Sequence, residues 1–282
     1  MEDKPKESGG QLFNYAPGSY LERTSRPIYG LLFLLPFIIF YELGTIFLNT
    51  DVLDESQVRV VAFVWLQRGL EYIGLGGKFA WAAPPLMVVM ILLAFQVVSK
   101  KSWRFIVSDV WPMAIECVLM AAPLIVLSLF LNGSSVGGEA NVSAATAKLA
   151  VEGDIVIKRS VLADIVTGIG AGIYEELVFR LVLICLLMLL LQDLLNFSHR
   201  NAIILSVIIS AALFSAHHHI VFVDGELGHV AVFSWTVFVF RAIAGVYFAA
   251  LFAMRGFGIA AGTHAFYDII ATLINAAFFP QP

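Results

Sequence analysis

Long apolar stretches alternate with short polar segments along most of the chain. An α-helix needs about 20 apolar residues to cross a bilayer. Stretches of about this length lie at residues 27–48, 79–98, 110–131, 161–191, 202–223, 232–254 and 257–279. The pattern therefore predicts an all-α, polytopic membrane protein with about seven transmembrane helices.

Three other segments depart from this pattern. Charged and amide residues interrupt the apolar face of 58–73, which predicts an interfacial or re-entrant helix, or an eighth span if it crosses. Residues 132–148 are rich in Gly, Ser and Ala and favour a flexible connection within a single helical membrane domain, 27–282. Residues 1–26 are polar and precede a full-length span, so we expect an N-terminal tail and no removable signal peptide.

The composition also indicates a membrane protein. Mean hydropathy is +0.87 and 13% of residues are charged, against about 25% in ordinary soluble domains. The net charge of -4 comes without a basic block, which argues against nucleic acid as a partner. Both cysteines lie in apolar stretches, so neither a disulfide framework nor a thiolate metal site is expected.

Basic residues suggest how the chain is oriented. They precede the first span and follow the second and fourth, whereas Asp51, Asp54 and Glu55 lie on the opposite side. The positive-inside rule then places the N-terminus in the cytoplasm, and we expect an integral protein of a bacterial inner (plasma) membrane. Lys148, Lys158 and Arg159 lie on the other side and weaken this inference.

Glu175, Glu176 and Arg180 lie within the apolar stretch 161–191. A charge near the centre of a membrane helix costs about 2.5 to 3.5 kcal/mol on insertion scales, which favours a functional role for the three. Glu176 and Arg180 are four residues apart and can pair on one helical face. Glu175 is rotated by about 100° and must meet a different neighbour. A structural charge cluster is the alternative interpretation.

Two later spans carry histidines. The fifth ends in a histidine triplet, in which Phe214 lies four residues before His218 and on the same face. The last contains His264 and Asp268 at the same spacing. Interfacial histidines and a helix-stabilising pair would be ordinary explanations, but one shared polar cavity explains all these residues together. A carboxylate and a histidine that share a water molecule form a general base, which indicates hydrolysis without a covalent nucleophile.

These residues resemble the motifs of the CPBP family of intramembrane glutamic endopeptidases, which includes the CAAX proteases and bacteriocin-processing proteins. EExxxR matches Glu175, Glu176 and Arg180; FxxxH matches Phe214 and His218; HxxxN or HxxxD matches His264 and Asp268. The resemblance covers about 161–275, and we take 161–279 as the catalytic core.

The resemblance implies a helical membrane protease that acts on a membrane-bound or lipidated protein without a cofactor. Glu175 and His218 would activate water, and His264 and Asp268 would stabilise the oxyanion. Glu176 and Arg180, with Phe214, would support the site. An ionised Asp268 cannot donate a hydrogen bond as asparagine does, so its role is either to orient His264 or to act in protonated form.

Other activities also have to be considered. Zinc ligation by Glu175, His218 and His264 is an alternative, although no HExxH motif is present. A non-catalytic membrane chaperone or an ion-coupled transporter would also place ionisable residues in the membrane. A rhomboid-type serine protease is disfavoured because the cluster of polar residues in the later spans sets no serine with a histidine. The sequence does not single out a substrate.

Overall fold

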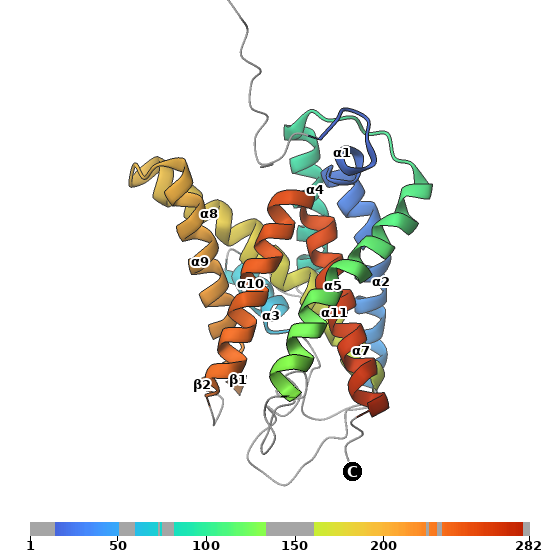
Figure 1. Ribbon diagram of the computed structural model, residues 1–282, viewed down its shortest axis with the longest axis vertical. Coiled ribbons are helices and arrows are strands. Elements are labelled where there is room, and N and C mark those ends of the chain that lie inside the picture. Colours follow the sequence, from blue (N-terminus) through green and yellow to red (C-terminus); the bar gives the residue numbers. More distant parts are fainter. Residues whose placement is uncertain are drawn as a thin grey trace, which may run out of the picture.

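The computed structural model describes residues 15–50, 60–72, 74, 82–133, 161–223, 226–229 and 233–278. Figure 1 shows a bundle in which most helices run along the long axis of the molecule. Six helical stretches of the described chain are long and apolar enough to cross a membrane. They are α2 (Pro27–Thr50), α5 (Val110–Gly133), the stretch from α7 (Val161–Glu176) through η3 (Leu177–Leu183) and α8 (Ile184–Met188) to η4 (Leu189–Leu194), α9 (His199–His217), α10 (Trp235–Arg255) and α11 (Phe257–Phe278).

The remaining elements are shorter. α4 (Ala83–Ser99) is apolar but has 17 residues. The others are α1 (Tyr20–Thr24), α3 (Val61–Tyr72), the 3-10 turn η2 (Val107–Asp109) and an antiparallel hairpin of β1 (Ile220–Val223) and β2 (Glu226–His229). The protein is thus a polytopic helical membrane protein, as the hydropathy pattern predicts.

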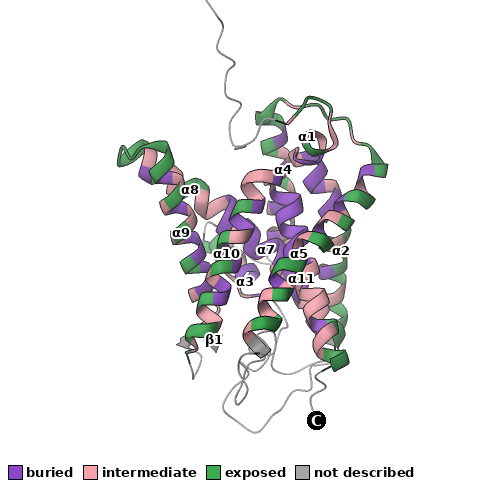
Figure 2. Ribbon diagram, in the orientation of Figure 1, coloured by how far each residue is buried: buried purple, intermediate pink, exposed green. Residues whose placement is uncertain are grey.

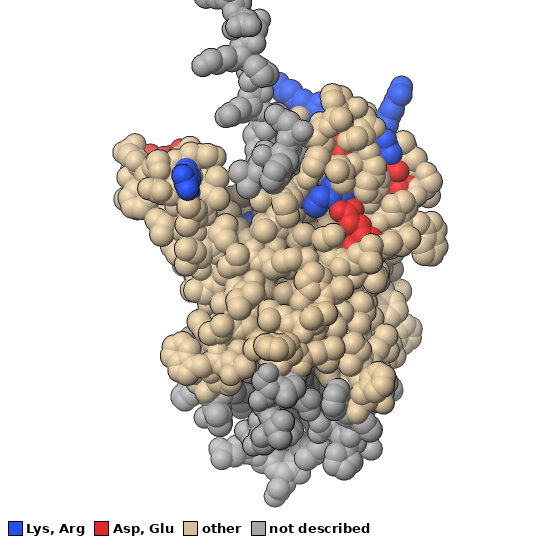
Figure 3. Space-filling view, in the orientation of Figure 1, with Lys and Arg blue, Asp and Glu red and all other residues tan. Residues whose placement is uncertain are grey.

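The outer faces of the bundle are strongly apolar. Large side chains such as Phe47, Trp111 and Phe130 are 69%, 76% and 70% exposed. Figure 2 shows exposed residues on the outward faces of the helices and buried ones inside, and Figure 3 shows a broad uncharged band below an end that carries the visible charges. Soluble monomers rarely expose such continuous apolar surface, so lipid is the solvent that this band fits.

Helix α11 lies at the centre of the bundle and packs against α7, α5, α2 and α10. Its first half consists largely of small residues, and the segment from Ile259 to Ala261 is fully buried. Small side chains let helix backbones approach closely, which is the main way that helices associate tightly within lipid. The position of α11 therefore follows from its composition, although its neighbours cannot be read from the sequence.

The contact between α7 and α11 is especially close at Gly172. A Cβ atom built on Gly172 would lie 2.5 Å from the backbone nitrogen of Ala265. No side chain fits there, so the two helices meet backbone to backbone. Because Glu175 and Glu176 follow Gly172 by one turn and His264 precedes Ala265, this contact brings the glutamates to the histidine.

Two predicted elements differ from the sequence interpretation. The fifth span was expected to continue to residue 223, but α9 ends at His217 and a β-hairpin begins at Ile220. Hydropathy alone does not place this boundary, because residues 220–223 are at least as apolar as the helix before them. The 12 residues of helix α3 span about 18 Å of a core about 30 Å thick, which fits the interfacial or re-entrant interpretation of 58–73.

The end of the expected N-terminal tail is packed onto the membrane helices. Arg255 of α10 pairs with Glu116 of α5 at 2.5 Å and also donates to the carbonyl of Leu21 and to the Thr24 hydroxyl. The Tyr20 hydroxyl donates to Glu116 at 2.8 Å, and burial together with this hydrogen bond raises the pKa of the phenol. Residues around α1 therefore belong to the folded bundle, while residues 1–14 lie outside the described part. The expected connection 132–148 lies outside it from residue 134 onward.

Candidate active site

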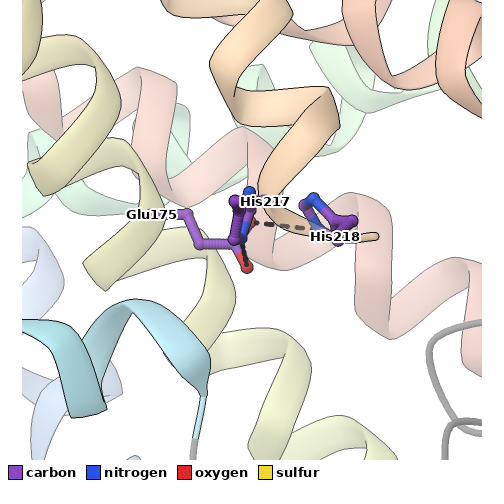
Figure 4. A group of neighbouring side chains, drawn as sticks. All are labelled: Glu175, His217 and His218. Atoms are coloured by element: carbon purple, nitrogen blue, oxygen red, sulfur yellow. Dashed lines mark ion pairs between the residues drawn. The ribbon is translucent and has the colours of Figure 1, made fainter. Parts of the chain in front are cut away.

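The two glutamates at the end of α7 point to different partners, as their rotation along the helix predicts. Glu175 Oε1 lies 3.4 Å from His217 Nε2, and Glu175 Oε2 lies 3.6 Å from His218 Nε2. Figure 4 shows the carboxylate reaching from α7 toward the two imidazoles at the end of α9. The Glu175 side chain is buried, and its Oε2 has no hydrogen-bond partner.

The carbonyl group of Phe214 orients both histidines. It accepts a hydrogen bond from His217 Nδ1 at 2.6 Å and from His218 Nδ1 at 2.9 Å. This carbonyl is free to do so because α9 ends at His217, and the last four carbonyls of a helix lack intrahelical partners. Since a carbonyl can only accept, both Nδ1 atoms carry hydrogen, and the Nε2 atoms of the neutral rings turn lone pairs toward Glu175.

Three acceptors therefore converge at this point. A carboxylate and two imidazole lone pairs repel one another unless a proton, a water that donates hydrogen bonds, or a cation lies among them. Aromatic rings hold the histidines in this arrangement: Phe214 meets His218 edge-on at 5.1 Å, and Phe179 and Trp65 contact His217 at 4.7 and 5.7 Å between ring centroids.

Glu176 is the centre of a second network. Its Oε1 lies 3.0 Å from Arg180 Nη1 and accepts a hydrogen bond of 2.8 Å from His264 Nδ1. Arg180 lies in the π-helix η3, donates to the carbonyl of Gly245 at 3.3 Å and places its guanidinium 4.1 Å from the centre of the Phe214 ring. One ion pair thus links α7, η3, α9, α10 and α11.

His264 lies between the two networks. With Nδ1 donating to Glu176, its Nε2 faces Glu175 Oε2 at 3.9 Å and Asp268 Oδ2 at 3.6 Å. Its ring stacks on Phe248 with 4.5 Å between centroids and an interplanar angle of 13°. Asp268 is the most exposed member of the cluster, with 27% of its side chain accessible, followed by His218 with 12%.

All predicted site residues lie in this one cluster. Their detailed pairing differs in two ways from what the motifs suggest. The carboxylate that holds His264 most closely is that of Glu176, whereas Asp268 is farther away. His217, which the motif passes over, is nearer to Glu175 than His218 is. The only sign of His217 in the sequence is its place in the histidine triplet. Because α9 ends there, helical spacing does not predict which of the three histidines face the same way.

A possible set of metal ligands also lies here. Ligand atoms of Glu175, His217 and His218 are all within 4.8 Å of one another, a set that overlaps only in part with the one considered from the sequence. Two imidazoles and a carboxylate are a donor set that suits zinc. The same atoms would also hold a water molecule.

Residues 158–270 match the family model described as type II CAAX prenyl endopeptidase Rce1-like. This segment is an Rce1-like domain of the CPBP family. The Rce1-like domain contains every residue of the two networks apart from Trp65. At the level of the family, it supports a CAAX-type intramembrane protease. Among curated proteins and among solved structures, no match was found.

Proposed function

We propose that the protein is an intramembrane endopeptidase that hydrolyses a peptide bond of a membrane-bound or lipidated protein with a water molecule activated by Glu175. The observation that carries this proposal is the convergence of the Glu175 carboxylate with the Nε2 atoms of His217 and His218, inside a membrane bundle and within an Rce1-like domain. Among the described residues, the contacts of Glu175, His217 and His218 include no serine hydroxyl or cysteine thiol that could act as a nucleophile.

Water activation follows from the orientation of the acceptors. A water molecule that donates one hydrogen to Glu175 and the other to His218 Nε2 turns its oxygen lone pairs away from both and toward a substrate carbonyl. As that oxygen attacks the carbonyl carbon, Glu175 takes the proton and later passes it to the departing amine nitrogen. The partial exposure of His218 gives water a way in.

His264 supplies the second element of the mechanism. Glu176 fixes its Nδ1–H, so a protonated ring directs Nε2–H toward the space beside Glu175. There it can donate to the oxygen that becomes negative as the tetrahedral intermediate forms. The Asp268 carboxylate lies 3.6 Å from the same nitrogen and stabilises this orientation of the ring through its charge. Arg180 acts through Glu176, as a positioning residue.

The direct test is Glu175→Gln. Glutamine keeps the shape of the side chain but cannot take a proton, so cleavage of a membrane-anchored CAAX-type reporter peptide should fall by a factor of about 100 to 10,000. The variant should keep the thermal stability of the wild type in detergent, and Glu71→Gln on α3 is the matched control for the loss of one carboxylate. Turnover by Glu175→Gln close to that of the wild type would overturn the proposal.

A zinc-dependent protease is the second candidate, favoured by the close spacing of Glu175, His217 and His218. The same carboxylate would then be a ligand, and its loss would abolish zinc binding together with activity. We expect purified, active protein to keep its activity after exhaustive chelation and to contain no stoichiometric zinc. Activity lost to a chelator and restored by zinc would establish the metalloprotease.

A further inference from the structure

Arg241 is a buried cation to which the mechanism assigns no role. The described part of the chain buries three arginines, Arg180, Arg241 and Arg255, and two of them have carboxylate partners. Arg241 is 8% exposed, and no hydrogen bond or ion pair joins it to another described residue. Burying a charge without a partner is strongly unfavourable, so such a residue calls for an explanation.

The position of Arg241 suggests one. It lies four residues before Gly245 and seven before Phe248, so the three share a face of α10. Gly245 accepts a hydrogen bond from Arg180, and Phe248 stacks on His264, which shows that this face is turned toward the candidate active site. The guanidinium also lies within electrostatic range of Glu175 and Asp268 of that site, and of His218.

The chemistry of the Arg241 side chain indicates which class of ligand it would bind. A guanidinium presents a planar fork of donors that matches a carboxylate in two parallel hydrogen bonds. The members of the site closest to solvent, His218 and Asp268, are among the groups that its charge reaches. A peptide bond placed at Glu175 would therefore lie within reach of the charge of Arg241.

We propose that Arg241 binds a carboxylate of the substrate beside the cleaved bond and thereby selects where the chain is cut. This inference rests on the proposed protease function and deepens it. The carboxylate belongs either to the end of the substrate chain or to an acidic side chain. Since an extended peptide advances about 3.3 to 3.6 Å per residue, a carboxylate held at a fixed place sets how many residues separate it from the cleaved bond.

The experiment compares three peptides that share one prenylated cysteine and the three residues after it. The first ends in a free carboxylate, the second in an amide, and the third in an amide with glutamate as its last residue. Wild type, Arg241→Gln, Arg241→Lys and the exposed control Arg200→Gln are assayed in lipid nanodiscs. The readout is the ratio of kcat/KM between peptides within each protein.

We expect wild type and Arg200→Gln to prefer the free carboxylate over the amide by about 10- to 100-fold, mainly through KM, as hydrogen bonds to a charged group imply. Arg241→Gln should bring this ratio close to one, and Arg241→Lys should fall between because it lacks the fork. Recovery by the third peptide would assign the carboxylate to a side chain, and no recovery would assign it to the chain end.

Arg241 could instead be a counter-ion that acts only through space. In that case Arg241→Gln would slow all three peptides equally and Arg241→Lys would resemble wild type, and either result would overturn the proposal. Thermal unfolding provides an independent check. Because no internal partner is left without its counterpart, Arg241→Gln should be at least as stable as wild type, whereas Arg255→Gln should be less stable.

A binding assay separates this inference from the proposed function. Fluorescent versions of the first two peptides are titrated against Glu175→Gln protein, with and without Arg241→Gln. A free-acid preference that depends on Arg241 would stand even if wild type cleaved none of the peptides, a result that would count against protease function alone. Equal binding of acid and amide, including no binding of either, would overturn the role of Arg241.

Discussion

At the level of single residues, the adjacent glutamates show how far sequence reasoning reaches. The helical rotation between Glu175 and Glu176 predicts that they face different neighbours, and the i, i+4 spacing predicts the pair with Arg180. Local spacing could not show that Glu176 also binds His264, because that hydrogen bond joins residues 88 positions apart. Local spacing also predicted Asp268 as the partner of His264, because Asp268 is the only carboxylate within one turn of that histidine.

The Glu176–Arg180 pair should be structural and functional at once. Arg180→Ala leaves a buried carboxylate without its cation, at a cost of about 3 to 5 kcal/mol, so the midpoint of thermal unfolding and the activity should both fall. Replacing both residues with leucine and methionine should recover much of the stability but not the activity, because His264 loses its acceptor. An Arg180→Ala protein as stable as wild type would contradict this.

Asp268 should help to orient the His264 ring without being essential for activity. Asp268→Asn keeps a group that can hydrogen-bond the ring and should retain measurable kcat, whereas Asp268→Ala should lose more because that partner is gone. Both should unfold like wild type, since Asp268 is partly exposed and lies 3.6 Å from its partner. A pH-rate profile of the three proteins on one reporter peptide is the measurement. An inactive Asn variant beside an active Ala variant would exclude the orienting role.

At the level of elements, hydropathy located nearly every long helix but not where each one ends. Length and apolar content predict a span, and they did so for α2, α5, α10 and α11. The end of α9 cannot be read from hydropathy, because residues 220–223 are at least as apolar as the helix before them. That end matters for the site, since it frees the carbonyl that orients His217 and His218.

The close contact of α7 with α11 predicts a sensitive glycine. Gly172→Ala adds a Cβ within 2.5 Å of the Ala265 nitrogen, which must push the helices apart and separate Glu175 and Glu176 from His264. Activity should fall sharply, and stability by roughly 1 to 3 kcal/mol, the usual cost of overpacking. Gly69→Ala on α3, whose added Cβ meets nothing within 4 Å, is the control and should behave as wild type. A fully active Gly172→Ala enzyme would refute this account of the helix contact.

At the level of the whole molecule, composition is enough to predict a membrane protein. It is not enough to predict which helices pack against each other. Which helices touch depends on shape matching between apolar faces that look alike in sequence. The central place of α11 and the packing of α3 beside His217 are therefore visible only in the fold. That the polar residues form one cluster was nonetheless predictable, because charged residues within apolar stretches are few and must find one another.

The distribution of charge over the whole molecule gives the last prediction, the orientation in the membrane. The visible basic residues gather at the end where α1 and the connection between α4 and α5 lie, and that connection contains Arg104 (Figure 3). Short connections rich in Lys and Arg stay in the cytoplasm. Arg104→Cys, in a chain whose two native cysteines are replaced, should thus react with a membrane-impermeant maleimide in inside-out vesicles and not in right-side-out ones. Phe278→Cys, at the opposite end of α11, should show the reverse. Labelling of Arg104→Cys only in right-side-out vesicles would show the opposite orientation in the membrane, with the N-terminus outside the cytoplasm.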